Sequence, residues 1–240
     1  MPTVLLVRHG RTTANAAGLL AGWGPGIDLD DIGRAQASGL GERIGAAGIA
    51  VCRAVSSPLP RCLETAALVL AQAGPGLPVE QDERLAECRY GAWTGRRLSE
   101  LASEPLWRTV QDQPAAATFP DGADYPGESL AAMSARAVEA VREIDAATEA
   151  REGAGAAWIA ITHGDVVKAL LADAMGLHLD QFQRLTVDPG SVSVVRYGLR
   201  RPAVLRVNDV GGDLRGLAVA PSAAGDADVG GGAGAASAAS

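Results

Sequence analysis

The feature that most constrains this chain is an apolar run close to its start, Thr3-Val4-Leu5-Leu6-Val7, which ends abruptly in Arg8-His9-Gly10. An uninterrupted run of this length is typical of a strand buried on both faces, in the middle of a parallel sheet. Arg8 and His9 then stand at the carboxyl end of that strand, where open α/β sheets bind ligands. Taken alone, the segment fits an ordinary surface loop better. Two later segments repeat the arrangement and favour a binding site instead.

The composition narrows the class of protein. With 240 residues, 48% of them hydrophobic, the chain can build one sizeable core, and we expect one α/β domain over residues 1–219. A net charge of −7 and the lack of a basic run argue against nucleic acid as a partner. Cys52, Cys62 and Cys88 form no CxxC motif, which indicates a reducing compartment, the cytoplasm. Neither a signal peptide nor a bilayer-spanning run is found, so we expect no membrane contact.

Strand and helix patterns alternate along the chain, which predicts a three-layer αβα fold with a mostly parallel central sheet. The predicted strands cover residues 3–7, 51–55, 77–82, 158–162, 191–197 and 203–207. The predicted helices cover residues 32–46, 58–74, 129–150 and 166–175. Asp30 or Asp31 is expected to cap the first of these helices, and Ser57 to cap the second, with Pro58 as its first helical residue.

Two segments stand apart from this alternation. Residues from about 96 to 126 hold short helical pieces broken by three prolines, and we predict a lid insertion over the C-terminal edge of the sheet. Its aromatic residues are interpreted as the packing core of the lid, with an apolar substrate wall as the alternative. Residues 220–240 are nearly all Ala, Gly, Ser and Asp, and we predict a disordered tail whose removal leaves stability and activity nearly unchanged.

Three strand-to-helix junctions carry cationic or titratable side chains: Arg8-His9, the stretch from Ser56 to Arg61, and His163-Gly164. If the three strands are parallel neighbours, the junctions meet at one sheet edge and helix N-termini point into the same pocket. Two arginines and two histidines there form an anion site, and phosphate is the expected guest. Each junction alone is weak evidence, but the chain has only three histidines. We assign no role to the third, His178.

These segments resemble the motifs of the histidine phosphatase superfamily, which includes the cofactor-dependent phosphoglycerate mutases. The resemblance runs in the order of the family from about Thr3 to Val207 and is specific. It rests on Leu6-Val7-Arg8-His9-Gly10-Arg11-Thr12 with Asn15, Ser56-Ser57-Pro58-Leu59-Pro60-Arg61-Cys62-Leu63-Glu64-Thr65, the segment from Leu85 to Gly95, Pro126-Gly127-Glu128-Ser129, and Thr162-His163-Gly164. Similar actinobacterial sequences are often labelled phosphomutases or phosphatases.

The resemblance implies a role for each matched residue. His9 would be the nucleophile that becomes a phosphohistidine, and Glu87 would be the general acid and then the general base. Asn15 looks like a substrate or phosphate contact, although an ordinary loop role fits nearly as well. The phosphate would be held by Arg8, Arg61 and His163. The implied partner is a small phosphomonoester, and neither a cofactor nor a metal is expected.

The sequence departs from the family pattern in two places. Phosphoglycerate mutases of this family carry a basic pair well downstream of the catalytic acid, but the stretch from Gln111 to Phe119 has no basic residue, and Arg96-Arg97 comes too early. A clamp for a substrate carboxylate is therefore doubtful. Asp165 follows His163-Gly164, where many members carry an apolar or small residue. We interpret Asp165 as a cap of the following helix, with orientation of His163 as the alternative.

The favoured hypothesis is a metal-independent phosphomonoester hydrolase that acts through a phosphohistidine. A phosphomutase that uses the same intermediate is the alternative. A non-catalytic phosphate-binding module is disfavoured, because such a module needs neither His9 nor Glu87. A metal-dependent hydrolase is disfavoured because no histidine lies in an HxH or HExxH motif. The sequence does not indicate the substrate, and a homodimer is left open.

Overall fold

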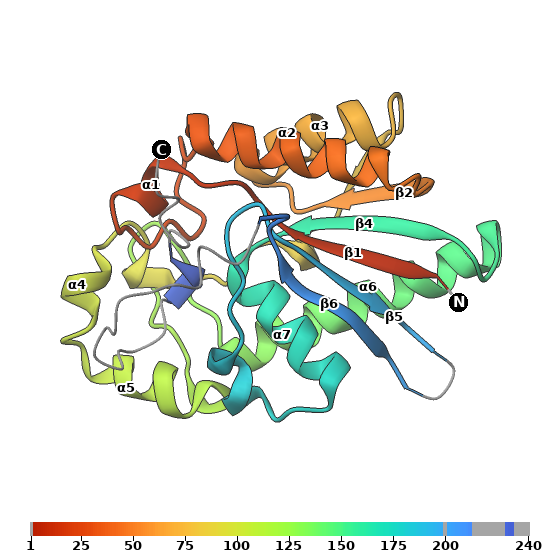
Figure 1. Ribbon diagram of the computed structural model, residues 1–240. Helices are drawn as coiled ribbons and strands as arrows, with labels where there is room; N and C mark the ends of the chain where they lie inside the picture. Colours follow the sequence, from red (N-terminus) through yellow and green to blue (C-terminus); the bar gives the residue numbers. More distant parts are fainter. Residues whose placement is uncertain (1, 199–200, 213–228, 233–240) are drawn as a thin grey trace.

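A six-stranded sheet with the order β3-β2-β4-β1-β5-β6 forms the centre of the computed structural model, which describes residues 2–198, 201–212 and 229–232 (Figure 1). The four N-terminal strands run parallel, β5 is antiparallel to β1, and β6 is antiparallel to β5. The predicted mostly parallel α/β sheet is therefore confirmed. The strands are β1 (Thr3–Arg8), β2 (Val51–Ser56), β3 (Val79–Gln81), β4 (Ala157–Thr162), β5 (Val192–Arg196) and β6 (Ala203–Asp209).

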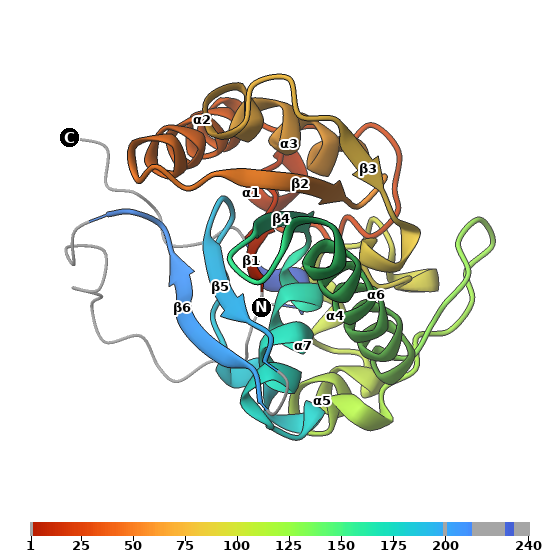
Figure 2. The ribbon, with the colours of Figure 1, turned by 90° about the vertical axis from the view of Figure 1, so that its right-hand side faces the viewer.

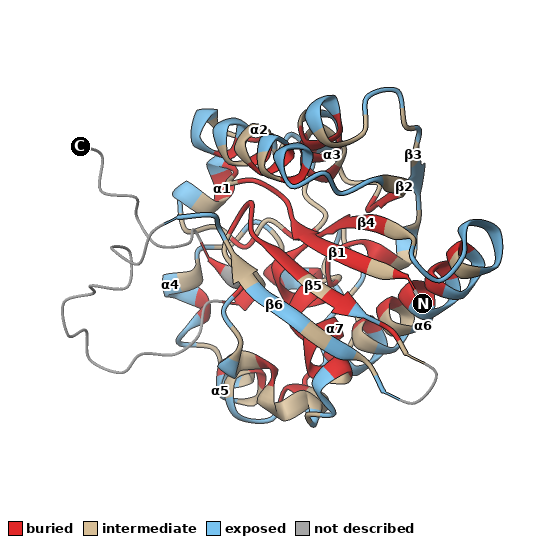
Figure 3. Ribbon diagram, turned by 45° about the vertical axis from the view of Figure 1, so that its right-hand side comes forward, coloured by how far each residue is buried: buried red, intermediate tan, exposed pale blue. Residues whose placement is uncertain are grey.

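Two helix layers cover the sheet, one on each face (Figure 2). One layer consists of α2 (Asp31–Ala46) and α3 (Pro60–Ala73), and the other of α6 (Leu130–Glu152) and α7 (Gly164–Met175). Successive side chains of a strand point to opposite faces. Leu5 and Val7 of β1 pack in the core under α2 and α3, whereas Val4 and Leu6 pack in the core under α6 and α7. The central strands are accordingly buried, while the edge strand β6 is largely exposed (Figure 3).

Side chains cap the starts of two of the long helices, α2 and α6. Asp30 caps α2 by accepting from the backbone N–H of Gly33 at 2.7 Å, as predicted. Ser129 caps α6 in the same way. The predicted start of α3 is wrong by two residues, because this helix begins at Pro60 and has no side-chain cap. The hydroxyl of Ser57 is used elsewhere, within the functional site.

The lid is built of short helices at the end of the sheet where the parallel strands finish (Figure 1). Its rings pack on one another: the Trp93 centroid lies 6.2 Å from that of Trp107 and 5.3 Å from that of Phe119. All three side chains are buried, in agreement with their interpretation as a packing core. The lid elements are α4 (Leu98–Leu101), α5 (Pro105–Asp112) and the 3₁₀ turn η3 (Pro114–Ala116).

Several short helical turns complete the chain. A four-residue helix, α1, lies in the stretch that follows β1. Within the described ranges, no helix is long and apolar enough to cross a membrane. The turns are α1 (Thr13–Ala16), η1 (Glu83–Leu85), η2 (Gly91–Trp93), η4 (Leu179–Arg184) and η6 (Val229–Gly231).

Four residues of the predicted disordered tail are described, and they differ from that prediction. Residues 229–232 include the turn η6, and the Val229 side chain is 1% exposed. Two glycines with positive φ, Gly230 and Gly232, let the backbone approach the protein closely. The composition of this segment offers little apolar surface to bury. Its backbone instead forms hydrogen bonds with buried charged side chains, and these bonds hold it against the protein. The rest of the predicted tail lies outside the described residues.

Candidate active site

His9 directly follows β1, and two hydrogen bonds define the state of its ring. Its Nδ1 lies 2.7 Å from the carbonyl oxygen of Gly10. A carbonyl can only accept, so Nδ1 carries the proton and Nε2 keeps its lone pair. The Arg61 Nε donates to that Nε2 at 3.3 Å. Burial, reinforced by Arg61 and then Arg8, holds the pKa of His9 well below its usual range. The imidazole is therefore neutral, with an unprotonated nitrogen facing a guanidinium.

The loop after His9 is held rigidly against α2 and α3. The backbone N–H of Gly10 donates to the hydroxyl of Thr65 at 3.1 Å. A β-carbon at Gly10 would lie 2.4 Å from the carbonyl oxygen of Gly33, so only glycine allows this approach. The position of His9 thus depends on a close backbone contact with the first turn of α2.

Arg61 joins the two histidines of the site. It stands in the first turn of α3 and is 2% exposed. Its Nη2 donates to the carbonyl oxygen of Gly22 at 2.8 Å and lies 3.1 Å from the Nδ1 of His163. Since a guanidinium only donates, this Nδ1 must be the accepting nitrogen.

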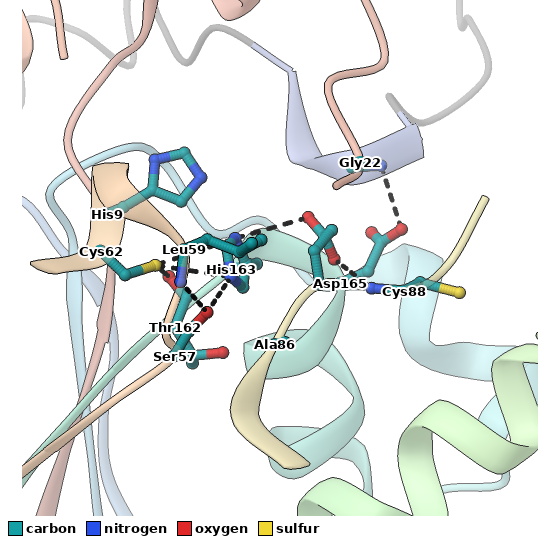
Figure 4. Close-up of polar contacts among 12 residues, drawn as sticks. His9, Gly22, Ser57, Leu59, Cys62, Ala86, Cys88, Thr162, His163 and Asp165 are labelled. Carbon is teal, nitrogen blue, oxygen red and sulfur yellow. Dashed lines mark hydrogen bonds and ion pairs between the residues drawn. The ribbon is translucent and has the colours of Figure 1, made fainter. Parts of the chain in front are cut away.

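His163 ends β4 and lies among residues of three elements, with Cys62 and Ser57 on one side of its ring (Figure 4). Because its Nδ1 accepts from Arg61, its Nε2 carries the proton and donates to the hydroxyl of Ser57 at 2.8 Å. Burial, with Arg61 and His9, holds the pKa of His163 well below its usual range. The Cys62 sulfur lies 3.4 Å from Nε2, and burial raises the pKa of its thiol to about 12, so this cysteine is protonated.

Arg8 ends β1 on the α6 and α7 face, opposite to His9. Its Nη1 donates to the carbonyl oxygen of Val187 at 2.7 Å, and its Nη2 to those of Gly232 at 2.6 Å and Gly230 at 3.3 Å. The side chain is fully buried. Burial lowers the pKa of Arg8 to about 10, which leaves the guanidinium charged at neutral pH. Part of its donor capacity is thus directed at backbone carbonyls, two of them from residues 229–232.

Glu87 lies on the irregular segment between η1 and η2, with its carboxylate turned into the site. The side chain accepts from the backbone N–H of Cys88 at 3.0 Å, and its other oxygen lies 3.9 Å from the Nδ1 of His163. Burial, together with the nearby charge of Asp165, raises the pKa of Glu87 to about 7, against the opposing effect of Arg61. A proton is therefore available on this carboxyl near neutral pH.

The backbone that carries Glu87 is held by two side chains that sequence reasoning missed. Arg136 of α6 donates to the carbonyl oxygens of Ala86 at 2.8 Å and Glu87 at 3.1 Å. The indole N–H of Trp23 donates to the same Glu87 carbonyl at 2.7 Å. No local pattern identifies Arg136, because an arginine on an amphipathic helix is usually solvated.

Asn15 stands on the rim of the cavity and also ends a local turn. Its carboxamide oxygen accepts from the backbone N–H of Thr12 at 3.1 Å and from the Thr12 hydroxyl at 2.8 Å. These bonds form a capping box at α1. The proposed substrate contact of Asn15 stays a prediction, and the capping bonds give this residue a structural role as well.

Asp165 is not the helix cap that the sequence suggested. The α7 helix has no side-chain cap at its N-terminus. One oxygen of Asp165 accepts instead from the hydroxyl of Tyr90 at 2.8 Å and from the backbone N–H of Gly230 at 3.0 Å. The other oxygen lies 3.7 Å from the ammonium of Lys168. Asp165 is thus part of a buried polar cluster beside the site.

Of the predicted site residues, His9, Asn15, Arg61 and Glu87 line one cavity with a polar base and a largely apolar wall, whereas Arg8 and His163 are not among its lining residues. His9, Arg61 and Glu87 form the base. The wall is lined by Leu19, Leu20, Ala21, Leu98 and Val229. Within the described ranges, no group of three or more His, Cys, Asp or Glu side chains could hold a metal ion.

A parallel sheet with two histidines and an arginine at its carboxyl edge defines a class of phosphoryl-binding enzymes, and comparison with known proteins identifies the family. The model of the histidine phosphatase superfamily (branch 1) matches residues 4–210, so the chain belongs to that superfamily. It is 31% identical over 214 residues to a 2,3-bisphosphoglycerate-dependent phosphoglycerate mutase of Caulobacter vibrioides, covering 81% of this chain and 89% of the relative.

Two solved structures show the same fold. Bacillus stearothermophilus YhfR is 29% identical with a TM-score of 0.75, covering 87% of this chain and 98% of that one. A putative alpha-ribazole-5'-P phosphatase of Escherichia coli is 27% identical with a TM-score of 0.71, covering 87% and 96%. The superfamily thus includes both mutases and phosphatases among the proteins that this chain resembles.

Proposed function

We propose that the protein is a metal-independent phosphomonoester hydrolase that forms a phosphohistidine at Nε2 of His9. The observation that carries this proposal is the Gly10 carbonyl on Nδ1, which leaves Nε2 unprotonated and directed at Arg61. A neutral imidazole is the form that can attack phosphorus, and a neighbouring guanidinium can neutralise the phosphoryl oxygens. The site needs no further group to generate its nucleophile.

The reaction balances with the groups present. Nε2 of His9 attacks phosphorus, the ester P–O bond breaks, and Glu87 gives its proton to the leaving oxygen. A water molecule then attacks the phosphohistidine, the Glu87 carboxylate takes a proton from that water, and the P–N bond breaks. His9 returns as the neutral imidazole. Arg61, with Arg8 and His163, would hold the transferring phosphoryl group.

Phosphomutase activity is the second candidate, favoured by the 31% identity to the Caulobacter phosphoglycerate mutase. A mutase must also hold a second anionic group of its substrate. The described wall of the cavity is mostly apolar, and its polar side chains, Asn15 and Tyr90, carry no positive charge. Two lid arginines are ion-paired within the lid: Arg96 to Glu104 at 2.7 Å and Arg108 to Asp112 at 2.8 Å. These observations support hydrolysis over transfer to a second hydroxyl.

Labelling of the nucleophile tests the proposal. Brief incubation with a radiolabelled aryl phosphate should label the wild-type protein through a bond that is labile in acid and stable in base. The label should be absent from His9→Ala and present in His178→Ala, a matched control because the His178 side chain is 72% exposed and outside the cavity. Labelling that persists in His9→Ala would remove His9 as the nucleophile.

A further inference from the structure

Asp165 is a fully buried carboxylate that the reaction described above does not use. It stands in the first turn of α7, two residues after His163. Three donors from separate places surround it: the Tyr90 hydroxyl, the Gly230 backbone N–H and, at 3.7 Å, the Lys168 ammonium. Two hydrogen-bond donors and a nearby cation therefore converge on this one carboxylate.

Glu87 has the opposite environment. Its hydrogen bond on the side chain comes from the backbone N–H of the next residue, Cys88, and its nearest imidazole, that of His163, is neutral. Asp165 and Cys88 lie together on the same side of His163 (Figure 4). The carboxyls of Glu87 and Asp165 are both buried and interact electrostatically, so ionising both has a cost in free energy. The carboxyl with fewer hydrogen-bond donors keeps the proton.

We propose that Asp165 is a positioning residue that keeps the catalytic proton on Glu87, an inference that rests on the proposed role of Glu87. Asp165 touches neither the phosphoryl group nor the leaving oxygen in this scheme. It acts as a fixed negative charge that makes Glu87 the acid of the pair. This gives a function to the residue at which the chain departs from the family pattern.

The charges that face Glu87 from the surrounding elements act in both directions. Arg61 and Arg8 lower the pKa of Glu87, and Asp165 raises it beyond the effect of burial. Asp165 therefore offsets the two arginines that the phosphate requires. The groups that face Glu87 are Arg8 at the end of β1, Arg61 and Cys62 of α3, Cys88 and Tyr90 of its own segment, Arg136 of α6, His163 after β4 and Asp165 of α7.

Carbon-13 titration of the glutamate side chains in the full chain tests the inference without turnover. The Glu87 signal is assigned by its absence from Glu87→Gln. We expect Glu87 of the wild type to titrate near pH 7, and its pKa to fall by about one unit in Asp165→Asn. Asp145→Asn is the matched control, because it makes the same change at a buried carboxylate that accepts from Trp158 outside the site.

Kinetics supply the second readout. For an alkyl phosphate, kcat/KM declines above a certain pH, and this pH should be lower in Asp165→Asn by as much as the pKa of Glu87 falls. For an aryl phosphate, whose leaving group needs no proton, the pH dependence of kcat/KM should not change. Asp165→Ser removes the same charge with a smaller side chain and serves if the asparagine variant does not fold. A purely structural role would lower both activities without moving the profile.

The outcomes separate the two hypotheses. Titration of wild-type Glu87 near its ordinary value overturns the inference whatever the variants do. An unchanged Glu87 titration in a folded neutral variant of Asp165 also overturns it, and leaves the proposed function intact. Absence of phosphomonoester turnover in the wild type contradicts the proposed function, while the titration still decides whether Asp165 holds the proton on Glu87.

Discussion

At the scale of single residues, His9 and His163 share one guanidinium but hold opposite tautomers. The Gly10 carbonyl places the proton of His9 on Nδ1, whereas Arg61 and Ser57 place that of His163 on Nε2. Only His9 therefore directs a lone pair from Nε2 into the cavity. The difference follows from which neighbours accept and which donate, and not from any difference in exposure.

The protonation of Glu87 predicts the pH dependence of the first step. A carboxyl whose pKa is raised to about 7 holds its proton below that pH and loses it above. We expect kcat/KM for alkyl phosphates to decline as the pH rises through about 7. Glu87→Gln should lower alkyl ester hydrolysis by about 10²–10⁴-fold and aryl ester hydrolysis much less. Equal losses for both esters would contradict the assignment of Glu87 as the acid.

Arg61 is expected to matter for activity and, to a smaller extent, for stability. Arg61→Ala should lower kcat by about 10²–10³-fold, because a positioned donor for the phosphoryl oxygens is lost. It should also cost about 1–3 kcal/mol of unfolding free energy, because the Gly22 carbonyl loses its partner.

Urea unfolding and turnover measure the two effects of Arg61→Ala separately. Arg34→Ala is the control, since this arginine forms its ion pairs on the surface with a side chain 45% exposed. Its stability should change by less than about 1 kcal/mol. A stability loss in Arg61→Ala large enough to account for the lost activity would favour a structural role.

At the scale of elements, the junctions after β1, β2 and β4 bring the site together. The three strands are neighbours in the sheet and run in the same direction, so their carboxyl ends meet. Helix α3 contributes Arg61 from its first turn, and α7 contributes Asp165 from its own. The lid and the turn η6 lie over this end of the sheet (Figure 1).

The turn η6 predicts a measurable effect of the C-terminal segment. The Gly230 and Gly232 carbonyls accept from the Nη2 of Arg8, a donor that the proposed function assigns to a phosphoryl oxygen. Removal of residues 229–240 should therefore tighten the binding of inorganic phosphate, by about five- to tenfold. Calorimetric titration measures this. This replaces the expectation from composition that the tail can be removed without effect.

A second truncation isolates the contribution of the turn. Removal of residues 235–240 alone keeps Gly230 and Gly232 as peptide carbonyls and should leave phosphate affinity near that of the full chain. Unchanged or weaker binding after removal of residues 229–240 would show that the segment does not compete for Arg8.

At the scale of the whole molecule, the charge distribution distinguishes hydrolase from mutase. The chain carries a net charge of −7, the lid arginines Arg96 and Arg108 are paired with lid carboxylates, and Arg97 donates to the carbonyl oxygen of Ala17. Such a surface disfavours a substrate with a second anionic group. We expect phosphate release to exceed isomer formation with phosphoglycerates and sugar phosphates, in EDTA, with or without added bisphosphate. Isomerisation that clearly outruns hydrolysis would leave the His9 chemistry standing and make the protein a mutase.

The sequence by itself was enough to predict the sheet, its two helix layers and the convergence of four site residues. The uninterrupted apolar runs of β1 and β4 identify strands, and the polar residues that end them identify the edge. Contiguous motifs carry this information because each one specifies a strand end and the side chain beside it. These strand ends predict that Arg8, His9, Arg61 and His163 lie together, and the family resemblance adds Glu87.

Only the tertiary structure decided which partners these residues take. Ser57 was interpreted as a helix cap and instead accepts from His163, and Asp165 was interpreted as a cap and instead accepts from Tyr90. The partners lie 106 and 75 positions apart in the chain, so no local pattern can distinguish these bonds from capping. A short polar side chain bonds to whichever donor or acceptor the packing brings within reach, and that distance is set by the assembled helices and sheet.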